Sequence, residues 1–474
     1  MTNALKIPAL SAIIVLSFFV LPSCAQAQST DQNGMLIQAK VWSKDENKQV
    51  HYSEWKDYYA TTVNMVKGFY AVQQTTTDKY GGAGSSLNKT GFFHTQKVGD
   101  RWWVVDPQGK EFCVKAVNGI RLNKPNEVPS SFNSIMDWAD NTITQIQGMG
   151  FNTAGCWSDT ATIIAFNKST THPIAYTTQL NLLSGYASKI KKEHPERKNN
   201  SILSFILDED FSSYCDSRAS TIAYLKNDPN LLGHFSDNEL PFTMGELKEI
   251  INNKNTDDKA YQTLLASYPA DTDFSTLNSD QKESFIALFA KKYYETVSKS
   301  IKKYDPNHLY IGSRIHSNAK NNRYIFQVAE AYVDIISINY YGFWEPKQDH
   351  MEEWAKWSSK PFFITEFYTK AEESGMSNLS GAGWIVKTQE DRGIHYQNFC
   401  MKLLASKNCV GWHWFRYQDN DPNDAKADDS NKDSNKGIYN IKYEPYKALA
   451  EKMQQLNNNV YGLIPYFDQL KNNR

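Results

Sequence analysis

The fold of this chain is decided by the stretch Leu-Leu-Gly-His-Phe-Ser-Asp-Asn-Glu at residues 231–239. Its apolar segment runs directly into polar residues and ends on a glutamate. A second stretch, Pro-Phe-Phe-Ile-Thr-Glu at residues 361–366, has the same form. Short apolar segments of this kind are typical of strands that are buried on both faces, as in a parallel sheet. We therefore expect Glu239 and Glu366 to lie at the carboxyl ends of two strands of one sheet.

Strand-like runs also occur on both sides of these two stretches. In chain order, the full set is 115–119, 150–154, 173–177, 231–237, 309–313, 333–339, 361–365 and 410–414. Short apolar strands that alternate with amphipathic helices predict a parallel sheet covered by helices. Eight such units favour a closed (β/α)8 TIM barrel, an α/β fold, over an open doubly wound sheet. No glycine-rich phosphate loop follows the first strand, which also argues against a dinucleotide-binding fold.

Helical periodicity fills most of the gaps between these strands. Apolar residues with helical spacing begin at Ile135 before strand two, at Phe285 before strand five and at Tyr396 before strand eight. A further helical face begins at Tyr446, after the last strand. The strands span more residues than in a typical barrel, and the excess lies mainly in residues 240–307.

The beginning of the sequence is typical of a targeting segment. The apolar run at residues 12–21 is too short to span a bilayer, and we expect residues 1–27 to be a signal peptide. A lipoprotein signal that ends before Cys24 is the alternative, and Cys24 would then carry a lipid anchor. Either segment implies a secreted, periplasmic or outer-membrane protein of a bacterium, with no membrane span. We expect residues 28–98 to form a short N-terminal extension and residues 99–474 to form the catalytic barrel.

A tight hairpin marks the start of the regular pattern. Two strand-like arms, 101–105 and 111–114, flank the turn Asp-Pro-Gln-Gly at residues 106–109. The second arm continues into the first barrel strand. We therefore expect the hairpin to be joined directly to the barrel.

Charge and composition exclude several classes of partner. The 474 residues carry a formal net charge of -1, which gives no electrostatic footprint for nucleic acid or for an anionic membrane. Aromatic residues make up 13% of a chain that is hydrophilic on average. A surplus of rings near strand ends suits a cleft that stacks the flat faces of sugars.

Neither the cysteines nor the acidic runs predict a metal or a cofactor. Three cysteines (Cys113, Cys156 and Cys409) fall in strand-like runs and Cys400 lies on the apolar face of a predicted helix. No CxxC pair and no Cys/His pattern with metal-ligand spacing occurs. The acidic run at residues 419–424 lacks the glycine and the final glutamate of a calcium loop. We expect the cysteines to be buried apolar residues and the acidic run to be a solvated loop.

The placement of the two glutamates predicts chemistry. In a barrel of this kind the carboxyl ends of all strands open onto one face, so Glu239 on strand four and Glu366 on strand seven would face each other across it. Hydrolysis of a glycosidic bond needs such a pair, one carboxyl to protonate the leaving oxygen and one carboxylate to attack or to activate water. Either residue alone would more often be a surface or salt-bridged carboxylate. Their shared position at strand ends favours the catalytic interpretation.

The residues around the pair resemble clan A, a large clan of retaining glycoside hydrolases on this barrel. In that clan an Asn-Glu pair that ends strand four supplies the acid/base, which matches Asn238 and Glu239. A glutamate on strand seven is the nucleophile, which matches Glu366. The resemblance implies a double displacement, with carboxyls about 5–5.5 Å apart and Glu239 kept protonated by burial and by the nearby negative charge. It also implies that Asn238 hydrogen-bonds the sugar 2-hydroxyl.

The resemblance extends to residues around the expected sugar site. Asn339 and Tyr341 at the end of strand six match a polar residue and a tyrosine that orients the nucleophile. Trp414 on strand eight matches the tryptophan that floors the sugar site, although Trp412, His413 and Trp414 alternate in direction and only one parity can face the sugar. Trp157, after strand two, is an even choice between a sugar platform and packing.

Within the clan, three stretches most resemble glycoside hydrolase family 50, the β-agarases. They lie at residues 101–107, 233–239 and 435–439, and the likeness covers roughly residues 78–464. Enzymes of that family usually carry a long sugar-binding region ahead of the barrel, whereas only about 70 residues precede it here. The departure puts action on agarose itself, and processive action on a long polymer, in question.

Two basic residues follow strand five, and their roles stay open. For Arg314, a structural salt bridge and the binding of a hydroxyl or an anionic group are equally good interpretations. For His316, a position in a solvent-facing loop is the favoured interpretation. The leading hypothesis is a secreted retaining β-glycosidase that acts on galactose-containing red-algal oligosaccharides. A β-galactosidase or another β-glycanase of the clan is the first alternative. A surface protein that binds glycans without cleaving them is the alternative from another class, although binding would not require both carboxylates.

Overall fold

The computed structural model describes residues 34–44, 50–72, 75–124, 127–197, 201–269 and 271–472. The expected signal segment at residues 1–27, with Cys24, lies outside the described residues. Within the described part of the chain, no helix is both long enough and apolar enough to cross a bilayer. The five cysteines that follow Cys24 are buried, as the sequence predicts, and all five are free.

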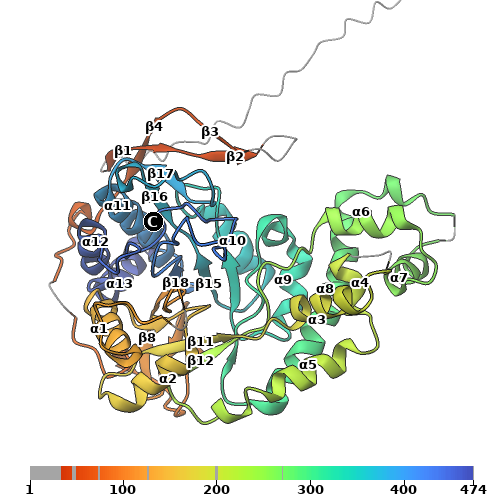
Figure 1. Ribbon diagram of the computed structural model, residues 1–474, viewed down its shortest axis with the longest axis horizontal. Helices are drawn as coiled ribbons and strands as arrows, with labels where there is room; N and C mark the ends of the chain where they lie inside the picture. Colours follow the sequence, from red (N-terminus) through yellow and green to blue (C-terminus); the bar gives the residue numbers. More distant parts are fainter. Residues whose placement is uncertain are drawn as a thin grey trace, which may run out of the picture.

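A sheet of eight parallel strands forms the centre of the molecule (Figure 1). In chain order the strands are β9 (Val114–Val117), β10 (Thr153–Ala154), β11 (Ala175–Gln179), β12 (Leu231–Phe235), β13 (Leu309–Tyr310), β14 (Ile336–Asn339), β15 (Phe362–Glu366) and β18 (Cys409–Trp414). Their order across the sheet is β13-β12-β11-β10-β9-β18-β15-β14, and each neighbouring pair is parallel. All eight predicted strands are confirmed, and their order is that of a TIM-like barrel.

The two end strands of the sheet, β13 and β14, are connected through the segment that follows β13. Ile315 forms an isolated parallel bridge with Ile338. The Ile315 amide donates to the Ser337 carbonyl at 2.8 Å, and the Asn339 amide donates to the Ile315 carbonyl at 2.9 Å. The segment after β13 is therefore held against β14 although it is not itself a strand.

Helices surround the curled sheet. They are α1 (Ile135–Gly148), α2 (Thr160–Ser169), α3 (Leu182–Glu193), α4 (Ile202–Ile206), α5 (Phe211–Ser220), α6 (Met244–Asn253), α7 (Lys259–Ser267), α8 (Ser279–Tyr304), α9 (Arg323–Glu330), α10 (Gln348–Trp357), α11 (Gln389–Leu404), α12 (Lys447–Asn457) and α13 (Val460–Asn472), with short 3-10 turns η1 (Val63–Met65), η2 (Ala223–Leu225), η3 (Phe274–Thr276), η4 (Ser317–Asn321) and η5 (Glu372–Ser374). The predicted helical faces are confirmed in α1, α8, α11 and α12. Local signals fix the helix starts: Asn278 and Gln281 form a capping box before α8, and Ser134 caps α1.

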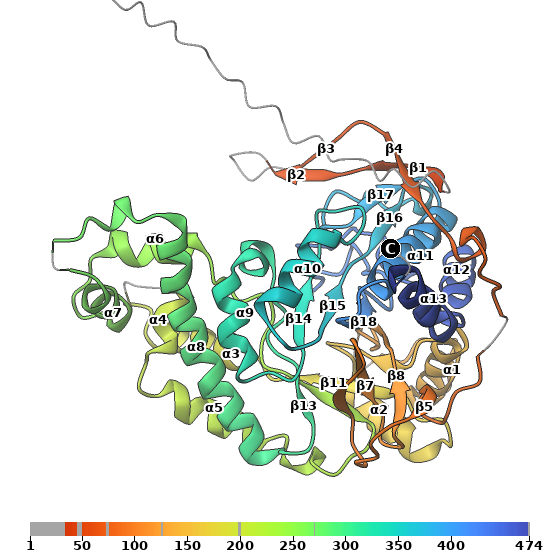
Figure 2. The same ribbon diagram turned by 180° about the vertical axis from the view of Figure 1, so that it is seen from behind.

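The extra length between strands four and five forms a side lobe. Helices α6 and α7 lie beside α4 and the first half of α8, and the views in Figures 1 and 2 show this lobe projecting away from the sheet. The lobe accounts for the excess residues that the sequence places between Leu240 and Asn307. It therefore lengthens the chain without adding a strand to the central sheet.

The N-terminal strands join a segment that directly follows strand seven. Strand β1 (Met35–Lys40) pairs with β4 (Lys56–Ala60) and with β17 (Trp384–Val386), which in turn pairs with β16 (Thr369–Ala371). Strands β2 (Trp42–Lys44) and β3 (Val50–Tyr52) form a separate two-stranded ribbon. Because β16 begins three residues after Glu366, this sheet lies above the end of the barrel where β15 finishes, as Figure 2 shows.

A second small sheet lies at the opposite end. It contains β5 (Ala83–Ser86), β6 (His94–Val98), β7 (Arg101–Val105) and β8 (Lys110–Phe112), and β7 and β8 form the predicted hairpin. Gly109 occupies the turn with a φ of +85°, a conformation that favours glycine. Phe93 and Phe112 pack in one apolar cluster with residues at the amino ends of barrel strands, such as Val114 and Ala175. The hairpin sheet thus covers the amino end of the barrel and leaves the carboxyl end for chemistry.

Candidate active site

Glu239 follows strand β12 at the carboxyl end of the barrel. Its side chain is 30% exposed, and its backbone has a left-handed φ of +50°. The Glu239 amide donates to the Ser313 carbonyl at 3.2 Å. Two residues earlier, Asp237 is fully buried and accepts hydrogen bonds from the amides of Leu183 and Ser184. These contacts fix the chain at the point where it turns out of the strand and direct Glu239 into the barrel mouth.

Glu366 is the last residue of β15 and lies deeper than Glu239. Its side chain is only 7% exposed. The Tyr341 hydroxyl donates to Glu366 Oε2 at 2.6 Å, as the resemblance implies. The Arg314 guanidinium donates from Nη2 to Glu366 Oε1, also at 2.6 Å. Both oxygens of this carboxylate are therefore held, one by a donor that follows β14 and one by a donor that follows β13.

Asn339 connects the two glutamates. It stands opposite Glu366 in the β14–β15 register, and its Nδ2 donates to Glu239 Oε1 at 2.7 Å. The Thr365 hydroxyl donates to Asn339 Oδ1 at 2.7 Å, which fixes the orientation of the amide. Asn339 Nδ2 also lies 3.3 Å from Asn238 Oδ1. The structure thus brings Asn238, Glu239, Asn339 and Glu366 together, and Tyr341 with them.

The two carboxyl groups stand in unequal environments. Burial raises the pKa of Glu366 to about 7; Arg314 and the Tyr341 hydrogen bond oppose this rise and Glu239 adds to it. Burial also raises the pKa of Tyr341 well above its ordinary value, so the tyrosine is a hydrogen-bond donor at neutral pH. Burial, which the resemblance implies for Glu239, is greater at Glu366.

Arg314 is the principal residue whose role the sequence leaves open. It is fully buried, and its guanidinium lies 4.3 Å from the centre of the Trp157 ring and 5.4 Å from that of Phe235. Trp157 and Arg314 both have positive φ, at +60° and +57°. A left-handed conformation costs a non-glycine residue about 1–3 kcal/mol, and such strain gathers at functional sites. Arg314 is therefore part of the candidate site and not a remote salt bridge.

Aromatic rings that follow β10, β15 and β18 pack beside Arg314 and Tyr341. Trp157 is partly exposed and meets Phe415 edge to face at 5.7 Å. Tyr368 lies 5.7 Å from Phe415 and 5.7 Å from Tyr341. Sequence reasoning missed Phe415 and Tyr368, although both follow predicted strands closely. Of these four rings, Trp157 and Tyr341 are partly exposed, whereas Tyr368 and Phe415 are buried.

The expected role of Trp414 is wrong in this structure. Trp414 has no exposed surface, and its indole nitrogen donates to the Lys436 carbonyl at 3.1 Å. It packs against Phe367 and Tyr396, on the helix side of β18. The side chain between the two tryptophans, His413, is the one that points into the barrel. Because side chains alternate in direction along β18, Trp414 lies in the core and presents no ring face to a sugar.

His316 lies at the mouth of the site. Its side chain is 34% exposed, and its Nδ1 is 3.7 Å from Glu239 Oε2. Its ring meets Tyr341 edge to face at 6.0 Å. Burial lowers the pKa of His316, while Glu239 acts in the opposite direction. The expectation of a merely solvent-facing histidine is replaced by one that contacts the Glu239 carboxyl.

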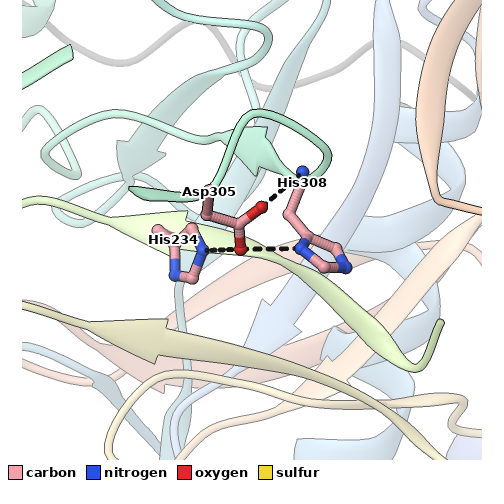
Figure 3. Close-up of side chains that lie close together, drawn as sticks. All are labelled: His234, Asp305 and His308. Atoms are coloured by element: carbon pink, nitrogen blue, oxygen red, sulfur yellow. Dashed lines mark hydrogen bonds and ion pairs between the residues drawn. The ribbon is translucent and has the colours of Figure 1, made fainter. Parts of the chain in front are cut away.

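A separate group of metal-ligand residue types lies below the site. His234, Asp305 and His308 are fully buried and close together (Figure 3). Asp305 Oδ2 lies 2.9 Å from His234 Nε2 and 2.7 Å from His308 Nδ1, which are hydrogen-bond distances. The outer ring nitrogens face Thr178 Oγ1 at 2.6 Å and the Asp228 carbonyl at 2.8 Å. Hydrogen bonds thus account for all four ring nitrogens of this group.

The acidic run that begins at Asp419 also has a structural role. Asp419 is almost fully buried and accepts hydrogen bonds from the amides of Lys436 and Gly437 and from the Tyr446 hydroxyl. The solvated loop expected for this run does not extend to Asp419. Its carboxylate instead holds the 435–439 stretch against the end of β18.

Known proteins similar to this chain include agarases. No protein-family model matches the chain. β-Agarase B of Vibrio sp. (strain JT0107) is 26% identical over 501 residues, which cover 81% of this chain and 50% of that protein. β-Agarase A of the same organism is 24% identical over 551 residues, which cover 92% of this chain and 52% of that protein. The chain therefore spans about half the length of these curated relatives.

Solved structures agree with this similarity. The structure titled BpGH50 superimposes with a TM-score of 0.80 at 29% identity and covers 92% of this chain and 96% of that one. The structure of an exo-β-agarase has a TM-score of 0.65 at 18% identity, covers 82% of this chain and 68% of that one, and supports the fold alone. The chain is thus similar to β-agarases and to a glycoside hydrolase structure of family 50.

Proposed function

We propose that this protein is a retaining β-glycoside hydrolase, similar to the β-agarases, that cleaves β-galactosidic bonds in agarose-type oligosaccharides. The observation that carries the proposal is the unequal glutamate pair at the carboxyl end of the sheet. Glu366 is buried with both oxygens held, and Glu239 is partly exposed at the mouth. Asn339 contacts Glu239 and stands in register with Glu366, which supports a short distance between the carboxyls. The similarity to β-agarases supports the substrate class.

In the first chemical step Glu366 attacks the anomeric carbon. Its ionised carboxylate forms a glycosyl ester, while Glu239 donates a proton to the leaving oxygen, so that the glycosidic bond breaks without creating a free alkoxide. Arg314 and Tyr341 stabilise the carboxylate before the attack, because both donate to its oxygens. Exposure suits Glu239 to its role, because the leaving sugar and the incoming water reach it from the mouth.

In the second step Glu239 acts as a base. Water, activated by the Glu239 carboxylate, attacks the glycosyl ester and releases the sugar with its original anomeric configuration. Asn238 is placed to hydrogen-bond the 2-hydroxyl, a contact expected to strengthen in the transition state. Asn339 holds Glu239 in position for both steps. Trp157 provides the platform for a sugar ring.

The remaining parts of the proposal concern architecture and location. The eight strands form a closed (β/α)8 barrel, with the bridge between Ile315 and Ile338 joining its ends. Residues 99–474 form the catalytic barrel, and residues 28–98 form an extension whose strands contribute to both small sheets. The protein is secreted, periplasmic or lipid-anchored at Cys24. Its mechanism uses neither a metal nor a cofactor.

Azide rescue tests the function and the two roles together. Purified protein is incubated with neoagaro- and agaro-oligosaccharides and with an aryl β-galactoside, and products are assigned by proton NMR. Glu366→Ala with azide should release an α-glycosyl azide, whereas Glu239→Ala with azide should release a β-glycosyl azide from the aryl glycoside. Absence of hydrolysis by wild type on every member of this panel would refute the proposal that the protein is a glycoside hydrolase.

The panel also separates the alternatives. Cleavage of the aryl galactoside alone, without any agarose fragment, would favour a β-galactosidase or another β-glycanase of the clan. A surface protein that only binds glycans should bind panel members in calorimetry and leave every bond intact. The hydrogen bonds to both oxygens of Glu366 favour the enzyme, because a sugar-binding cleft has no need of a buried carboxylate prepared for attack.

A further inference from the structure

Two turns of the same construction face each other at the amino end of the barrel. Asp78 begins one of them, at residues 78–82, and Asp106 begins the other, at residues 106–110 between β7 and β8. In each turn, Oδ1 of the aspartate accepts from the backbone amides two and four residues later. These distances are 2.9 and 3.0 Å for Asp78, and 2.8 and 2.9 Å for Asp106. One oxygen of each carboxyl is therefore occupied by its own turn.

The second oxygen of each carboxyl, Oδ2, lies between the two turns. Asp106 has no exposed surface, and a Cβ atom added to Gly82 in the Asp78 turn would overlap Asp106 Oδ2. The Asp106 carboxyl is within hydrogen-bonding distance of the Asp78 carboxyl. Both Oδ2 atoms are buried, and no donor among the described residues reaches either of them. The two turns therefore approach each other through two acceptors, and ionised carboxylates in this position would repel each other.

A hydrogen bond between two carboxyl groups requires a proton on one of them. An ionised carboxylate only accepts, and two such charges at this separation disfavour the doubly ionised state. Burial raises the pKa of Asp106 to about 7, and the Asp78 carboxyl adds to this rise, whereas the amides of Lys110 and Gln108 oppose it. The pair therefore keeps a proton in a pH range in which an ordinary aspartate is ionised.

We propose that Asp78 and Asp106 share one proton, and that loss of this proton above neutral pH loosens the hairpin sheet from the amino end of the barrel. With the proton in place, a hydrogen bond joins the segment before β5 to the turn of the hairpin. Without it, two buried negative charges face each other across the same contact. The inference concerns stability and local mobility, and it does not rest on the proposed function.

Tyr461 joins both sides of this contact to helix α13. Its hydroxyl donates to the Gly81 carbonyl at 2.8 Å and accepts from the Cys113 amide at 3.2 Å. Gly81 lies inside the Asp78 turn, and Cys113 lies between β8 and β9. Separation of the two turns would therefore disturb the contacts that hold the hairpin sheet to α13 and to the first barrel strand.

Titratable groups of other elements also lie around the pair. Burial raises the pKa of Tyr80 to about 12, with further increases from both aspartates of the pair and from Asp228. Burial also raises the pKa of Tyr461 well above its ordinary value. Burial lowers the pKa of Lys115 to about 8, and its ammonium lies 5.1 Å from the centre of the Tyr461 ring. These groups are the same in wild type and in variants of the pair, so a comparison of the two isolates the shared proton.

The lysines of the two turns do not take the place of the proton. Lys110 Nζ donates to Ser86 Oγ at 3.0 Å and to the Gly84 carbonyl at 3.4 Å. Lys79 Nζ lies 4.9 Å from the centre of the Tyr80 ring. Neither ammonium reaches an Oδ2 atom of the pair. The negative charge that appears on deprotonation is therefore not neutralised by these lysines.

The sign of the pH effect follows from the raised pKa. The folded protein keeps the proton up to about pH 7, whereas the unfolded chain releases it near the ordinary value of 3.8. The stabilising contribution is therefore fully present below about pH 4 and is lost as the pH rises through 7. Glu366, whose pKa is also about 7, contributes a change of the same sign. Each variant must for this reason be compared with wild type at the same pH.

Asparagine is a permanent copy of the protonated carboxyl. In Asp106→Asn the amide oxygen keeps the two hydrogen bonds of Oδ1, and Nδ2 donates to Asp78 Oδ2; Asp78→Asn is the mirror case. Between pH 5 and pH 7, the equilibrium constant of urea unfolding should rise by up to about tenfold per pH unit more in wild type than in either variant. The double variant places two donors against each other and should be less stable than each single variant at every pH.

Asp421→Asn supplies a matched control. Asp421 Oδ1 accepts from the Asn423 amide at 2.9 Å in a turn at the surface, and the substitution should keep the wild-type pH dependence. Hydrogen exchange locates the effect: at pH 8 the amides of β7 and β8 should exchange faster in wild type than in Asp106→Asn. The amides of β14 should exchange equally in the two proteins.

Three outcomes would overturn the inference. The same pH dependence of unfolding in wild type and in both single variants would exclude a shared proton, as would a double variant as stable as the single ones. Equal exchange of the β7 and β8 amides at pH 8 would exclude loosening of the hairpin sheet. EDTA should leave the stability of wild type at pH 8 unchanged. A loss of stability with EDTA that Asp106→Asn does not show would mean that a cation, and not a proton, joins the carboxyls.

Discussion

Two buried ionic groups lie at opposite ends of strand β13 and differ in how they are satisfied. Before the strand, Asp305 Oδ2 accepts from His234 and His308, and Asp305 Oδ1 accepts from the amides of Asn307 and His308 at 3.1 and 3.2 Å. After the strand, Arg314 binds Glu366 but leaves Nε and Nη1 without partners among the described residues and adopts a left-handed φ. The first group is fully hydrogen-bonded, and the second is strained.

The difference teaches where the molecule is built for stability and where for chemistry. A fully satisfied buried network rigidifies its surroundings, and the Asp305 group joins the end of α8 to β12. An incompletely satisfied buried charge beside a partly exposed carboxyl lowers stability, and such sites are common where a reaction occurs. Substitutions at the two ends of β13 should therefore affect different properties.

The largest effect is expected at Glu366. Glu366→Ala removes the proposed nucleophile and should lower kcat by about 10⁴-fold or more, which corresponds to about 5.4 kcal/mol. The thermal midpoint should also fall, because the substitution leaves the fully buried Arg314 guanidinium without its counter-ion. Steady-state kinetics and thermal unfolding check both statements. An activity within tenfold of wild type would contradict the proposal that the reaction occurs at the carboxyl end of the barrel.

The next effect concerns the amino end of β13. Asp305→Ala leaves His234 and His308 without their common acceptor in a fully buried site, and it should lower the free energy of unfolding by about 3–5 kcal/mol. Urea unfolding measures this, and kcat should stay near the wild-type value. Asp280→Ala, at an exposed ion pair, is the matched control and should change stability by less than about 1 kcal/mol.

The same aspartate predicts an acid sensitivity. Its hydrogen bonds from His234 and His308 hold the pKa of Asp305 well below the usual range, against the effect of burial. The carboxylate is favoured in the folded state, so its contribution to stability is present above about pH 4 and is lost as the pH falls further. The loss of stability between pH 5 and pH 3 should therefore be smaller in Asp305→Ala than in wild type. Equal losses would contradict a stabilising role.

A smaller effect on kcat/KM is expected from a change of pH. The pKa of Glu366 is about 7, and the ionised form is the nucleophile, so kcat/KM should fall as the pH drops below 7. Glu366 is deprotonated above this value, which gives the sign of the change. Tyr341→Phe removes a hydrogen bond to the carboxylate and should move the fall to higher pH. A profile that is flat between pH 5 and pH 8 would contradict the burial of Glu366.

The smallest effect is expected from the aromatic border. Trp157→Ala should raise KM by about fivefold, near 1 kcal/mol, with a smaller change in kcat, since the ring contacts sugar and not the reacting atoms. Trp414→Phe retains an aromatic ring in the core and should leave KM unchanged. Equal effects of the two substitutions on KM would contradict the conclusion that Trp414 is buried away from the sugar.

Much of the fold was predictable because it follows from local patterns. The eight strands are apolar runs bounded by polar residues, and Glu239, Glu366, Asn339 and Tyr341 lie at or just beyond strand ends. Parallel strands bring their carboxyl ends together, so the gathering of these residues needs only the strand order. The pairing of β1 with β17 was not predictable, because it joins segments more than 300 residues apart through backbone hydrogen bonds.

The parts of the site that the sequence does not predict depend on the direction in which a side chain points and not on the position of its residue in the chain. Alternation along β18 separates Trp414 from His413 but does not say which of them faces inward. The register of β15 against β18 shifts between Phe362 and Ile364, and such irregularities decide the outcome. Arg314 lies beyond its strand on a left-handed residue, where alternation no longer predicts direction. A basic residue a few positions after a barrel strand was the only signal that pointed to it.

Trapping of the glycosyl-enzyme tests the central claim most directly. Wild-type protein is treated with an activated 2-deoxy-2-fluoro-β-galactoside, with which the ester forms faster than it is hydrolysed. The digested protein is then examined by mass spectrometry. The account predicts one added fluorosugar on the peptide that contains Glu366, no label in Glu366→Gln, and loss of activity in proportion to labelling. A label on another carboxyl, or substrate hydrolysis that inverts the anomeric configuration with no label at all, would contradict it.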